Sequence, residues 1–340
     1  PHPQTPTVFP ERKPGKRIRV GYYSADFRHH AIAYLIAEML ECHDKHAFEV
    51  FAFDLHPGQS DAMSQRLFAA VDHVVNLTSH SDASAAQLSR ALGIDIAVDL
   101  GGHTINSRTG IFANRCAPVQ LSYLGFPGTL GAAYYDYAVL DRNIAAPEDR
   151  HHYAEQLVYL PHCYQVNDSK RPIAQRHFSR SELGLPEQAF VFCCFNNAYK
   201  ILPQTFDGWM RILNAVPASV LWLLDHNPVA THRLREEAKA RGVAPQRLVF
   251  APRMPLAEHL ARHRAADLFI DTLPYNAHTT ASDALWAGLP VITCVGKTFA
   301  ARVAGSLLRA VGLPELITHT QAEFEAKAIA YATNPPELRK

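Results

Sequence analysis

The chain has 340 residues, of which 48% are hydrophobic and 19% charged, a composition typical of a folded globular protein. Lysine and arginine number 33 against 32 aspartates and glutamates, which argues against a protein built to neutralise nucleic-acid phosphates. No stretch approaches the roughly 20 apolar residues of a membrane span, and the length predicts two domains. Scattered cysteines without a C-x-x-C motif predict reduced thiols and a cytoplasmic location.

The first predicted domain begins after residues 1–16, a proline-rich stretch that we expect to form a linker or N-terminal arm. From residue 17 to residue 170, strand-like and helix-like segments alternate. This alternation indicates a mostly parallel sheet with helices on both faces. The predicted strands are 18–24, 48–55, 74–77, 94–100, 119–124 and 135–140, and the predicted helices are 33–42, 62–70 and 83–92.

A second series of the same kind occupies residues 171–340, after a polar, proline-containing boundary at 165–184. The fold class is therefore α/β, with two tandem doubly wound, Rossmann-like domains. Ligands bind beyond the carboxyl ends of the strands in such sheets, and two domains that face each other create one cleft. The predicted strands are 190–195, 220–224, 248–251, 268–271 and 291–295, and the predicted helices are 205–215, 231–241, 256–265, 281–287 and 298–311.

Several common motifs are missing from the sequence. There is no Walker A motif, no G-x-G-x-x-G after the first strand and no H-E-x-x-H. His259 and His263 share a helix face, but no third ligand accompanies them, so we predict no metal site. The chain also lacks the D-x-D element that holds a divalent ion in many sugar-nucleotide enzymes. A diphosphate bound here would therefore be neutralised by fixed protein donors.

The segment at 271–288 joins a buried strand to a helix. Thr280 and Asp283 fit a capping box, and Thr279 and His278 precede them. The unpaired amides and the dipole at a helix N-terminus favour anions, so this turn is a candidate phosphate site. The alternative is that these residues only begin and cap the helix.

Other candidates follow strands in the same way. Lys200 lies after the first strand of the second domain, where it can bind phosphate oxygens or be an exposed loop residue. In the first domain His30, Asp99 and His103 lie near strand ends and are suited to acid–base chemistry. As alternatives, Asp99 can cap the turn at Gly101, and His30 can cap the helix that it precedes.

Several segments, taken in order, resemble the catalytic region of the O-linked N-acetylglucosamine transferase family, in particular a bacterial homologue. They are I-R-V-G-Y-Y-S-A-D-F at 18–27, F-E-V-F at 48–51, A-P-V-Q-L-S-Y-L-G-F-P-G-T at 117–129, F-N-N-A-Y-K-I at 195–201, S-V-L-W-L-L at 219–224 and H-T-T-A-S-D-A-L-W-A-G-L-P at 278–290.

The resemblance implies an inverting glycosyltransferase of the B-type fold that needs no metal or other cofactor. It implies transfer of N-acetylglucosamine from UDP-GlcNAc to Ser or Thr hydroxyls of a polypeptide acceptor, with no nucleic-acid or membrane partner. The first domain would face the acceptor and the second would bind the UDP-sugar. By resemblance, the UDP-binding residues are Asn197, His259, Arg262, His278, Thr279, Thr280 and Asp283; the sugar-binding residues are Gly125 and Pro127; and the catalytic residues are His30, Asp99, His103 and Lys200.

Some features depart from the family pattern or stay open. Tetratricopeptide repeats usually precede this region and are absent from the chain, so we expect them on a further N-terminal part. Asn197 stands where glutamine is usual. Either His30 or Asp99 can be the base. Two alternative functions are a UDP-glucose-dependent asparagine glucosyltransferase and a non-catalytic UDP-sugar sensor.

Overall fold

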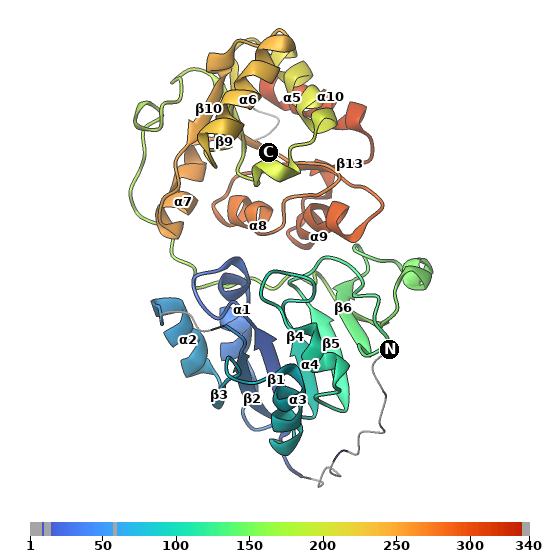
Figure 1. Cartoon of the computed structure of the whole chain (residues 1–340). Helices are drawn as coiled ribbons and strands as arrows, with labels where there is room; N and C mark the ends of the chain where they lie inside the picture. The colour runs from blue at the N-terminus through green and yellow to red at the C-terminus, as the bar shows by residue number, and fades with distance from the viewer. Residues whose placement is uncertain (1–8, 10–14, 57–59, 335–340) are drawn as a thin grey trace. The chain divides into compact units, whose positions relative to one another are not determined.

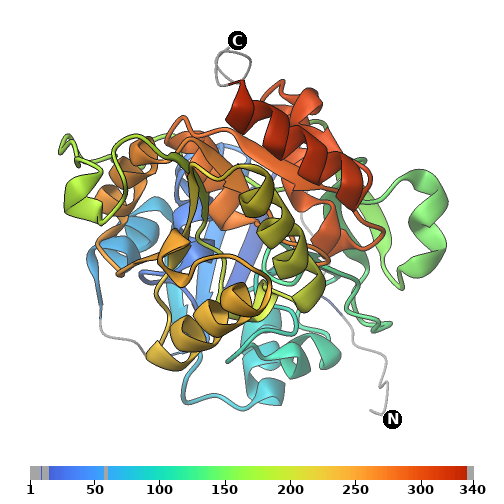
Figure 2. The same ribbon diagram turned by 90° about the horizontal axis from the view of Figure 1, so that it is seen from above.

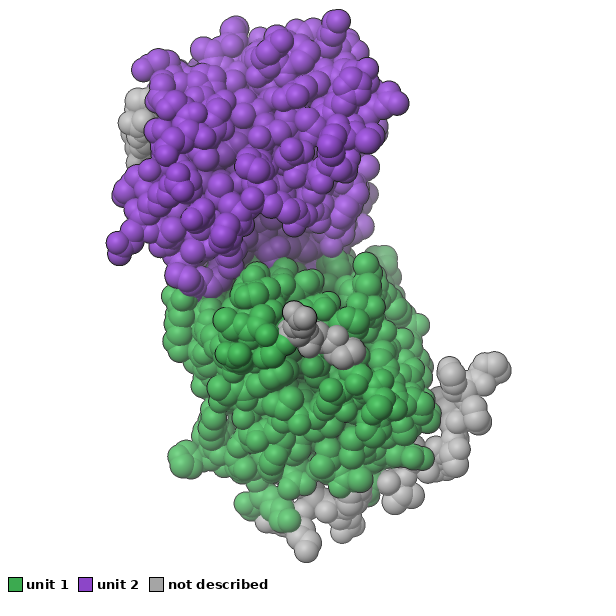
Figure 3. Space-filling model, turned by 60° about the vertical axis from the view of Figure 1, so that its left-hand side comes forward, with its two compact units in different colours: residues 1–170 green, residues 171–340 purple. Residues whose placement is uncertain are grey.

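The computed structural model describes residues 9, 15–56 and 60–334. The chain divides into two compact units, residues 1–170 and 171–340, here called unit 1 and unit 2 (Figure 3). The predicted arm at 1–16 lies outside the described residues except for positions 9, 15 and 16. Within the described part of the chain, no helix is both long and apolar enough to cross a membrane.

Unit 1 contains a sheet of seven parallel strands in the order β3-β2-β1-β4-β5-β6-β7 (Figure 1). The order reverses between β1 and β4, where Tyr23 pairs with Asp99. The strands are β1 (Ile18–Ser24), β2 (Phe48–Asp54), β3 (His73–Asn76), β4 (Ile96–Asp99), β5 (Val119–Tyr123), β6 (Tyr137–Asp141) and β7 (Gln156–Leu160). The α-helices are α1 (Ala31–Glu41), α2 (Ala62–Ala70), α3 (Asp82–Ala91) and α4 (Thr109–Ala113).

Unit 2 repeats this plan with six parallel strands in the order β10-β9-β8-β11-β12-β13. Helix α10 lies beside α5 (Figure 2). The strands are β8 (Phe190–Cys194), β9 (Ser219–Leu224), β10 (Leu248–Ala251), β11 (Leu268–Ile270), β12 (Val291–Cys294) and β13 (Ile317–Thr318). The α-helices are α5 (Pro203–Ala215), α6 (Pro228–Ala240), α7 (Leu256–Arg262), α8 (Thr279–Trp286), α9 (Val303–Ala310) and α10 (Gln321–Thr333).

A central strand of a parallel sheet can be apolar along its whole length, because helices cover both faces of the sheet. Every residue of β8 is buried, which is possible only where helices cover both faces of a parallel sheet. In unit 1 the ring of Tyr23 stacks on Phe53 with 4.3 Å between centroids, inside the core cluster. The predicted fold class, with two parallel sheets and alternating helices, is confirmed.

Some elements differ from the sequence-based prediction. Strands β7 and β13 and helices α4 and α10 were not predicted. Strand β7 lies at the sheet edge and exposes Val158, and its sequence Q-L-V-Y-L has the apolar run of a strand, so the prediction missed a signal that was present. The predicted helix at 298–311 is divided into a 3₁₀ turn at Phe299–Ala301 and α9.

Candidate functional site

Most candidate residues lie where the strand order of each sheet reverses. In unit 1, His30 follows β1, while Asp99 and His103 lie at the end of β4. In unit 2 the segment containing Lys200 follows β8, and the segment containing His278 follows β11. The crevice at such a reversal, beyond the carboxyl ends of the strands, is where doubly wound sheets bind ligands.

Lys200 is held inward and is not the exposed loop lysine that the sequence left open as an alternative. It ends a 3₁₀ turn at Ala198–Lys200, and its Nζ donates to the carbonyl of Asn276 at 2.8 Å. The same nitrogen lies 4.0 Å from the centroid of the Tyr275 ring, a cation–π contact. Burial lowers the pKa of Lys200 to about 8, against the opposing effect of Asp271. The ammonium group is therefore charged at neutral pH and poorly hydrated.

The His278 ring stacks on the ring of Tyr275 in the same loop. Its centroid is 4.9 Å from that of Tyr275, and Nε2 lies 3.1 Å from the carbonyl of Ala300. A carbonyl only accepts, so Nε2 carries the proton. Burial, and then the charge of Lys200, lowers the pKa of His278 to about 3. His278 is thus neutral at pH 7, and the positive charge at this turn belongs to Lys200.

The capping box predicted for the helix in this segment is wrong. Helix α8 begins at Thr279, with His278 as the N-cap residue and no side-chain cap. The Thr280 hydroxyl instead donates to Oδ1 of Asn196, and Asp283 pairs with a residue outside the helix. The T-x-x-D spacing fits a cap, but long-range partners compete for both side chains. The first amides of α8 consequently have no intrahelical partner and no side-chain cap.

A buried polar network fixes the loop between β11 and α8. Oδ1 of Asp271 accepts from the amides of Thr272 at 2.7 Å and Ala277 at 2.6 Å, and Oδ2 accepts from the Thr293 hydroxyl at 2.6 Å. Asn196 donates to the Thr272 hydroxyl at 2.8 Å. Burial raises the pKa of Asp271 to about 6. Sequence reasoning missed Asp271 and Asn196 as site residues, although each lies directly after a strand.

Asn197, the residue named from the sequence, behaves differently from its neighbour. Its side chain is exposed, and its backbone carbonyl accepts from the amide of Lys200 at 2.9 Å. Asn196 is 2% exposed and bonds to the network. The buried member of the Asn pair therefore connects β8 to α8, while the exposed member starts the Lys200 turn.

Asp283 forms an ion pair with Arg171, which sequence reasoning also missed. The Nη1 of Arg171 donates to Oδ1 of Asp283, and the two side chains are 3% and 13% exposed. Burial raises the pKa of Asp283, while the charge of Arg171 opposes that rise. The two residues are 112 positions apart in the chain, so no local motif signals the pair.

His259 and Arg262 lie on α7 and contact the end of β8. The His259 ring is 5.2 Å from that of Phe195, and burial lowers its pKa to about 2, which makes it neutral. Arg262 is 1% exposed; its Nη1 donates to Pro252 at 2.6 Å, and its guanidinium lies 4.7 Å from the Phe195 ring centroid. Arg262 thus packs in the core, and His259 is the member of the pair that reaches the surface.

In unit 1, Asp99 is buried and its carboxylate is fully engaged. Oδ1 accepts from the amides of Gly101 at 2.8 Å and Gly102 at 2.9 Å, and Oδ2 accepts from the Tyr135 hydroxyl. Burial raises the pKa of Asp99 against these hydrogen bonds. The turn-capping alternative for Asp99 is confirmed.

His30 is exposed and serves as the N-cap of α1, so the capping alternative is also confirmed. Its Nδ1 lies 3.3 Å from the amide of Ile32 and 3.5 Å from Oδ2 of Asp26. Burial lowers the pKa of His30, although Asp26 raises it. The ring is therefore neutral at pH 7, and its Nε2 has no hydrogen-bond partner among the residues that the structure describes.

The loop after β5 packs against the turn after β4. A Cβ atom on Gly125 would lie 2.0 Å from the carbonyl oxygen of Leu100, so a side chain is excluded there. The exposed His103 ring meets Phe126 edge-on at 5.1 Å, and its Nε2 is 3.1 Å from the carbonyl of Leu130. Pro127 lies in the same partly exposed loop. The structure brings His103 and this loop together, whereas no contact joins them to His30 in the described part of unit 1.

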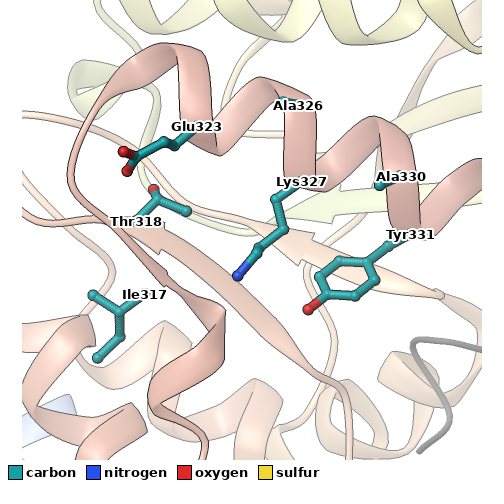
Figure 4. Close-up of a pocket in the computed structure, with 7 residues that line it drawn as sticks. All are labelled: Ile317, Thr318, Glu323, Ala326, Lys327, Ala330 and Tyr331. Atoms are coloured by element: carbon teal, nitrogen blue, oxygen red, sulfur yellow. The ribbon is translucent and has the colours of Figure 1, made fainter.

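A hollow of about 370 Å³ lies between β13 and α10 (Figure 4). Lys327 turns its Nζ to the carbonyl of Glu315. No candidate residue lines this hollow, so it has no part in the site. Its walls are Ile317, Thr318, Glu323, Ala326, Lys327, Ala330 and Tyr331.

Within residues 9, 15–56 and 60–334, no three His, Cys, Asp or Glu side chains gather as metal ligands. The cationic and donor groups at the end of β8 and the start of α8 suit an anion, and they include no carboxylate pair that would hold a divalent ion. The chemistry of these groups therefore suits an anion such as a phosphate.

The chain is similar to known proteins over nearly its whole length. It is 39% identical over 344 residues to a protein of Arabidopsis thaliana named as a probable UDP-N-acetylglucosamine–peptide N-acetylglucosaminyltransferase, SEC, covering 98% of this chain and 35% of the relative. It is 27% identical over 450 residues to the UDP-N-acetylglucosamine–peptide N-acetylglucosaminyltransferase of Caenorhabditis elegans, covering 98% and 39%. The chain thus spans little more than a third of these relatives.

A solved structure, a mutant O-GlcNAc transferase of Thermobaculum terrenum, matches with a TM-score of 0.90 and 35% identity, covering 98% of this chain and 64% of that one. The model of glycosyl transferase family 41 matches residues 3–179 and 172–340. The family model and the structural match both cover nearly the whole chain, and the chain belongs to glycosyl transferase family 41.

Proposed function

We propose that the protein transfers N-acetylglucosamine from UDP-GlcNAc to Ser or Thr hydroxyls of a polypeptide, with inversion at the anomeric carbon. The observation that carries the proposal is the half-buried Lys200 ammonium, which contacts the Tyr275 loop just before the N-terminus of α8. The names of the relatives support the choice of donor sugar and acceptor.

The reaction is a direct displacement. The acceptor oxygen attacks C1 of the sugar, the bond from C1 to the β-phosphate oxygen breaks, and its electron pair leaves with UDP. The transition state has oxocarbenium character, and negative charge develops on the diphosphate. Lys200 and the first amides of α8 are fixed, poorly hydrated donors that stabilise this charge. With these donors, the reaction needs no metal ion or other cofactor.

The hydroxyl proton goes to His30 in this proposal. Nε2 is the accepting atom, which requires the neutral tautomer with the proton on Nδ1. In this tautomer Nδ1 donates to Asp26 and no longer accepts from the amide of Ile32, so the side-chain cap of α1 is given up in the reacting form. Asp26, 3.5 Å from Nδ1, favours that tautomer and stabilises the imidazolium that forms. Asp99 is the weaker candidate because three donors already occupy its carboxylate. His103 and the loop containing Gly125 and Pro127 contact the acceptor and the sugar.

The remaining roles belong to the nucleotide. Asp283 accepts from the ribose hydroxyls, His278, Thr279 and Thr280 surround the diphosphate, and the neutral His259 ring stacks on uracil. Asn197 contributes backbone atoms, and Arg262 supports His259 from the core. We place the protein in the cytoplasm, which the buried thiols of Cys193 and Cys194 support because such thiols persist in a reducing compartment.

Mass spectrometry of protein targets incubated with UDP-GlcNAc or with UDP-glucose, in the presence of EDTA, tests the proposal. We expect HexNAc on Ser or Thr residues and undiminished transfer with the chelator. Hexose on Asn residues would instead indicate an asparagine glucosyltransferase. Tight UDP binding without any modified target would indicate a UDP-sugar sensor, and loss of transfer with EDTA would refute metal independence.

A further inference from the structure

Arg171, the first residue of unit 2, is attached twice to one turn of α8. Its backbone carbonyl accepts from Nε1 of Trp286 at 3.2 Å, and its guanidinium lies 5.8 Å from the centroid of the Trp286 ring. Its Nη1 donates to Asp283, which is three residues before Trp286 and therefore on the same helix face. Both the backbone and the side chain of Arg171 are thus fixed relative to Asp283.

The ion pair with Asp283 is the polar contact that orients the Arg171 guanidinium. Its Nε and Nη2 are buried and have no hydrogen-bond partner within the described part of the chain. The side chain is 3% exposed, so bulk solvent does not reach these two nitrogens. A buried cation in this position costs desolvation energy that a salt bridge for stability alone rarely recovers. A role beyond stability is therefore the better explanation for this ion pair.

The two oxygens of Asp283 are in different situations. Oδ1 accepts from Arg171, whereas Oδ2 has no hydrogen-bond partner among the described residues. The Asp283 side chain is 13% exposed, which leaves part of the carboxylate accessible. A carboxylate held by one oxygen presents the other in a fixed direction, with lone pairs for two hydroxyl donors.

We infer that Arg171 is a positioning residue that holds Oδ1 of Asp283 and so directs Oδ2 to the 2′- and 3′-hydroxyls of a bound ribonucleotide. This inference rests on the proposed function, because it takes Asp283 as the ribose-binding residue. Arg171 itself makes no contact with the nucleotide. Its contribution is to pre-organise the carboxylate and keep it ionised before the nucleotide arrives.

The experiment is calorimetry with UDP and with 2′,3′-dideoxy-UDP on the full chain, for the wild type, Arg171→Met and Arg171→Lys. The wild type should prefer UDP by about 10- to 100-fold, since hydrogen bonds to a charged group contribute about 1.5–3 kcal/mol. Arg171→Met should reduce this preference to about threefold or less and leave the affinity for dideoxy-UDP unchanged. Arg171→Lys, which keeps the charge but loses the planar fork, should show an intermediate preference.

The control is the affinity for dideoxy-UDP, which reports a folded site without the ribose contact. An equal loss of affinity for both nucleotides in Arg171→Met would overturn the inference, because the residue would then only support the fold. Full wild-type preference in Arg171→Lys would also overturn it, since charge without geometry would suffice, and this variant remains informative if Arg171→Met does not fold. A wild type that binds both nucleotides equally would refute the ribose role of Asp283 itself.

Discussion

The first six strands of the sheet in unit 1 have the same order as the six strands in unit 2. The two points where the strand order reverses differ in how many of their polar side chains are buried and hydrogen-bonded within the protein. In unit 2, Asn196 and Asp271 are buried and bonded, and burial lowers the pKa of Lys200. In unit 1, His30 and His103 are exposed, and Asp99 alone of the three is buried. Under the proposed function, the diphosphate is the same in every reaction cycle and suits a rigid, poorly hydrated site. The proposed polypeptide acceptors vary, and exposed side chains can adapt to them.

The largest effect should come from the half-buried cation of unit 2. Lys200→Ala removes the charge that faces the leaving diphosphate, and we expect kcat to fall by about 10²–10³-fold. Turnover measured with UDP-GlcNAc and a peptide acceptor tests this. Lys239→Ala, which removes an exposed lysine in the last turn of α6, is the matched control and should keep most of the activity. Wild-type turnover in Lys200→Ala would show that the cation of unit 2 has no part in the reaction.

The residue proposed as the base, the exposed His30 of unit 1, should have the next largest effect. His30→Asn keeps a side-chain acceptor for the first turn of α1 but cannot take up a proton, so we expect about 10²-fold slower transfer with an unchanged melting temperature. His30→Ala should show the same rate loss and also lose about 1 kcal/mol of stability from the missing cap. Normal turnover in His30→Asn would leave His30 only its capping role.

Asp99 sharpens the comparison because it is buried and hydrogen-bonded, as Asn196 and Asp271 are in unit 2. Asp99→Ala leaves the amides of Gly101 and Gly102 unpaired, and we expect the free energy of unfolding to fall by about 3 kcal/mol in urea titrations. Asp99→Asn retains an acceptor for these amides and should keep most of the stability and turnover. A collapse of turnover in a stable Asp99→Asn would make Asp99 the base.

The rate of transfer should fall at high pH because Lys200 loses its charge. Lys200 loses its charge as pH rises through its pKa of about 8, so kcat/KM for the donor should fall about tenfold per pH unit above that value. Lys200→Arg stays charged throughout this range and should lack the fall, although its absolute rate will be lower. A fall at the same pH in Lys200→Arg would assign the titration to another group.

The smallest effect should come from the link between β8 and α8. Thr280→Val keeps the shape of the side chain but cannot donate to Asn196, and we expect UDP affinity to fall by about three- to tenfold, as for one hydrogen bond. Thr280→Ser keeps the hydroxyl and is the matched control. Calorimetry with UDP measures both, and equal affinities would show that the link does not shape the nucleotide site.

Much of the fold could be predicted from the sequence because its signals are local. Helix 62–70 and strand 248–251 have the predicted bounds, since apolar runs and turn residues delimit them. Strand β13 could not be predicted, because it has only two residues, whereas the apolar run of β7 was present in the sequence and was missed.

From the sequence, only those site residues could be predicted that lie shortly after a predicted strand. Lys200 and His278 were found in this way, but their pKa shifts arise from burial that no local pattern reports. The partners of Thr280 and Asp283 are 84 and 112 residues away, and both contradict the local capping pattern. The residues that tie the loops together were therefore missed, while the residues at the loop tips were found.

The opposite orientation of the two neighbouring asparagines offers a place for a reporter group. The side chain of Asn197 is exposed three residues before Lys200, whereas Asn196 must stay as it is. A fluorophore attached through Asn197→Cys, after the exposed Cys42 is replaced by serine, would therefore sit at the rim of the donor site without breaking its network. Its emission would follow nucleotide arrival and departure in real time during turnover.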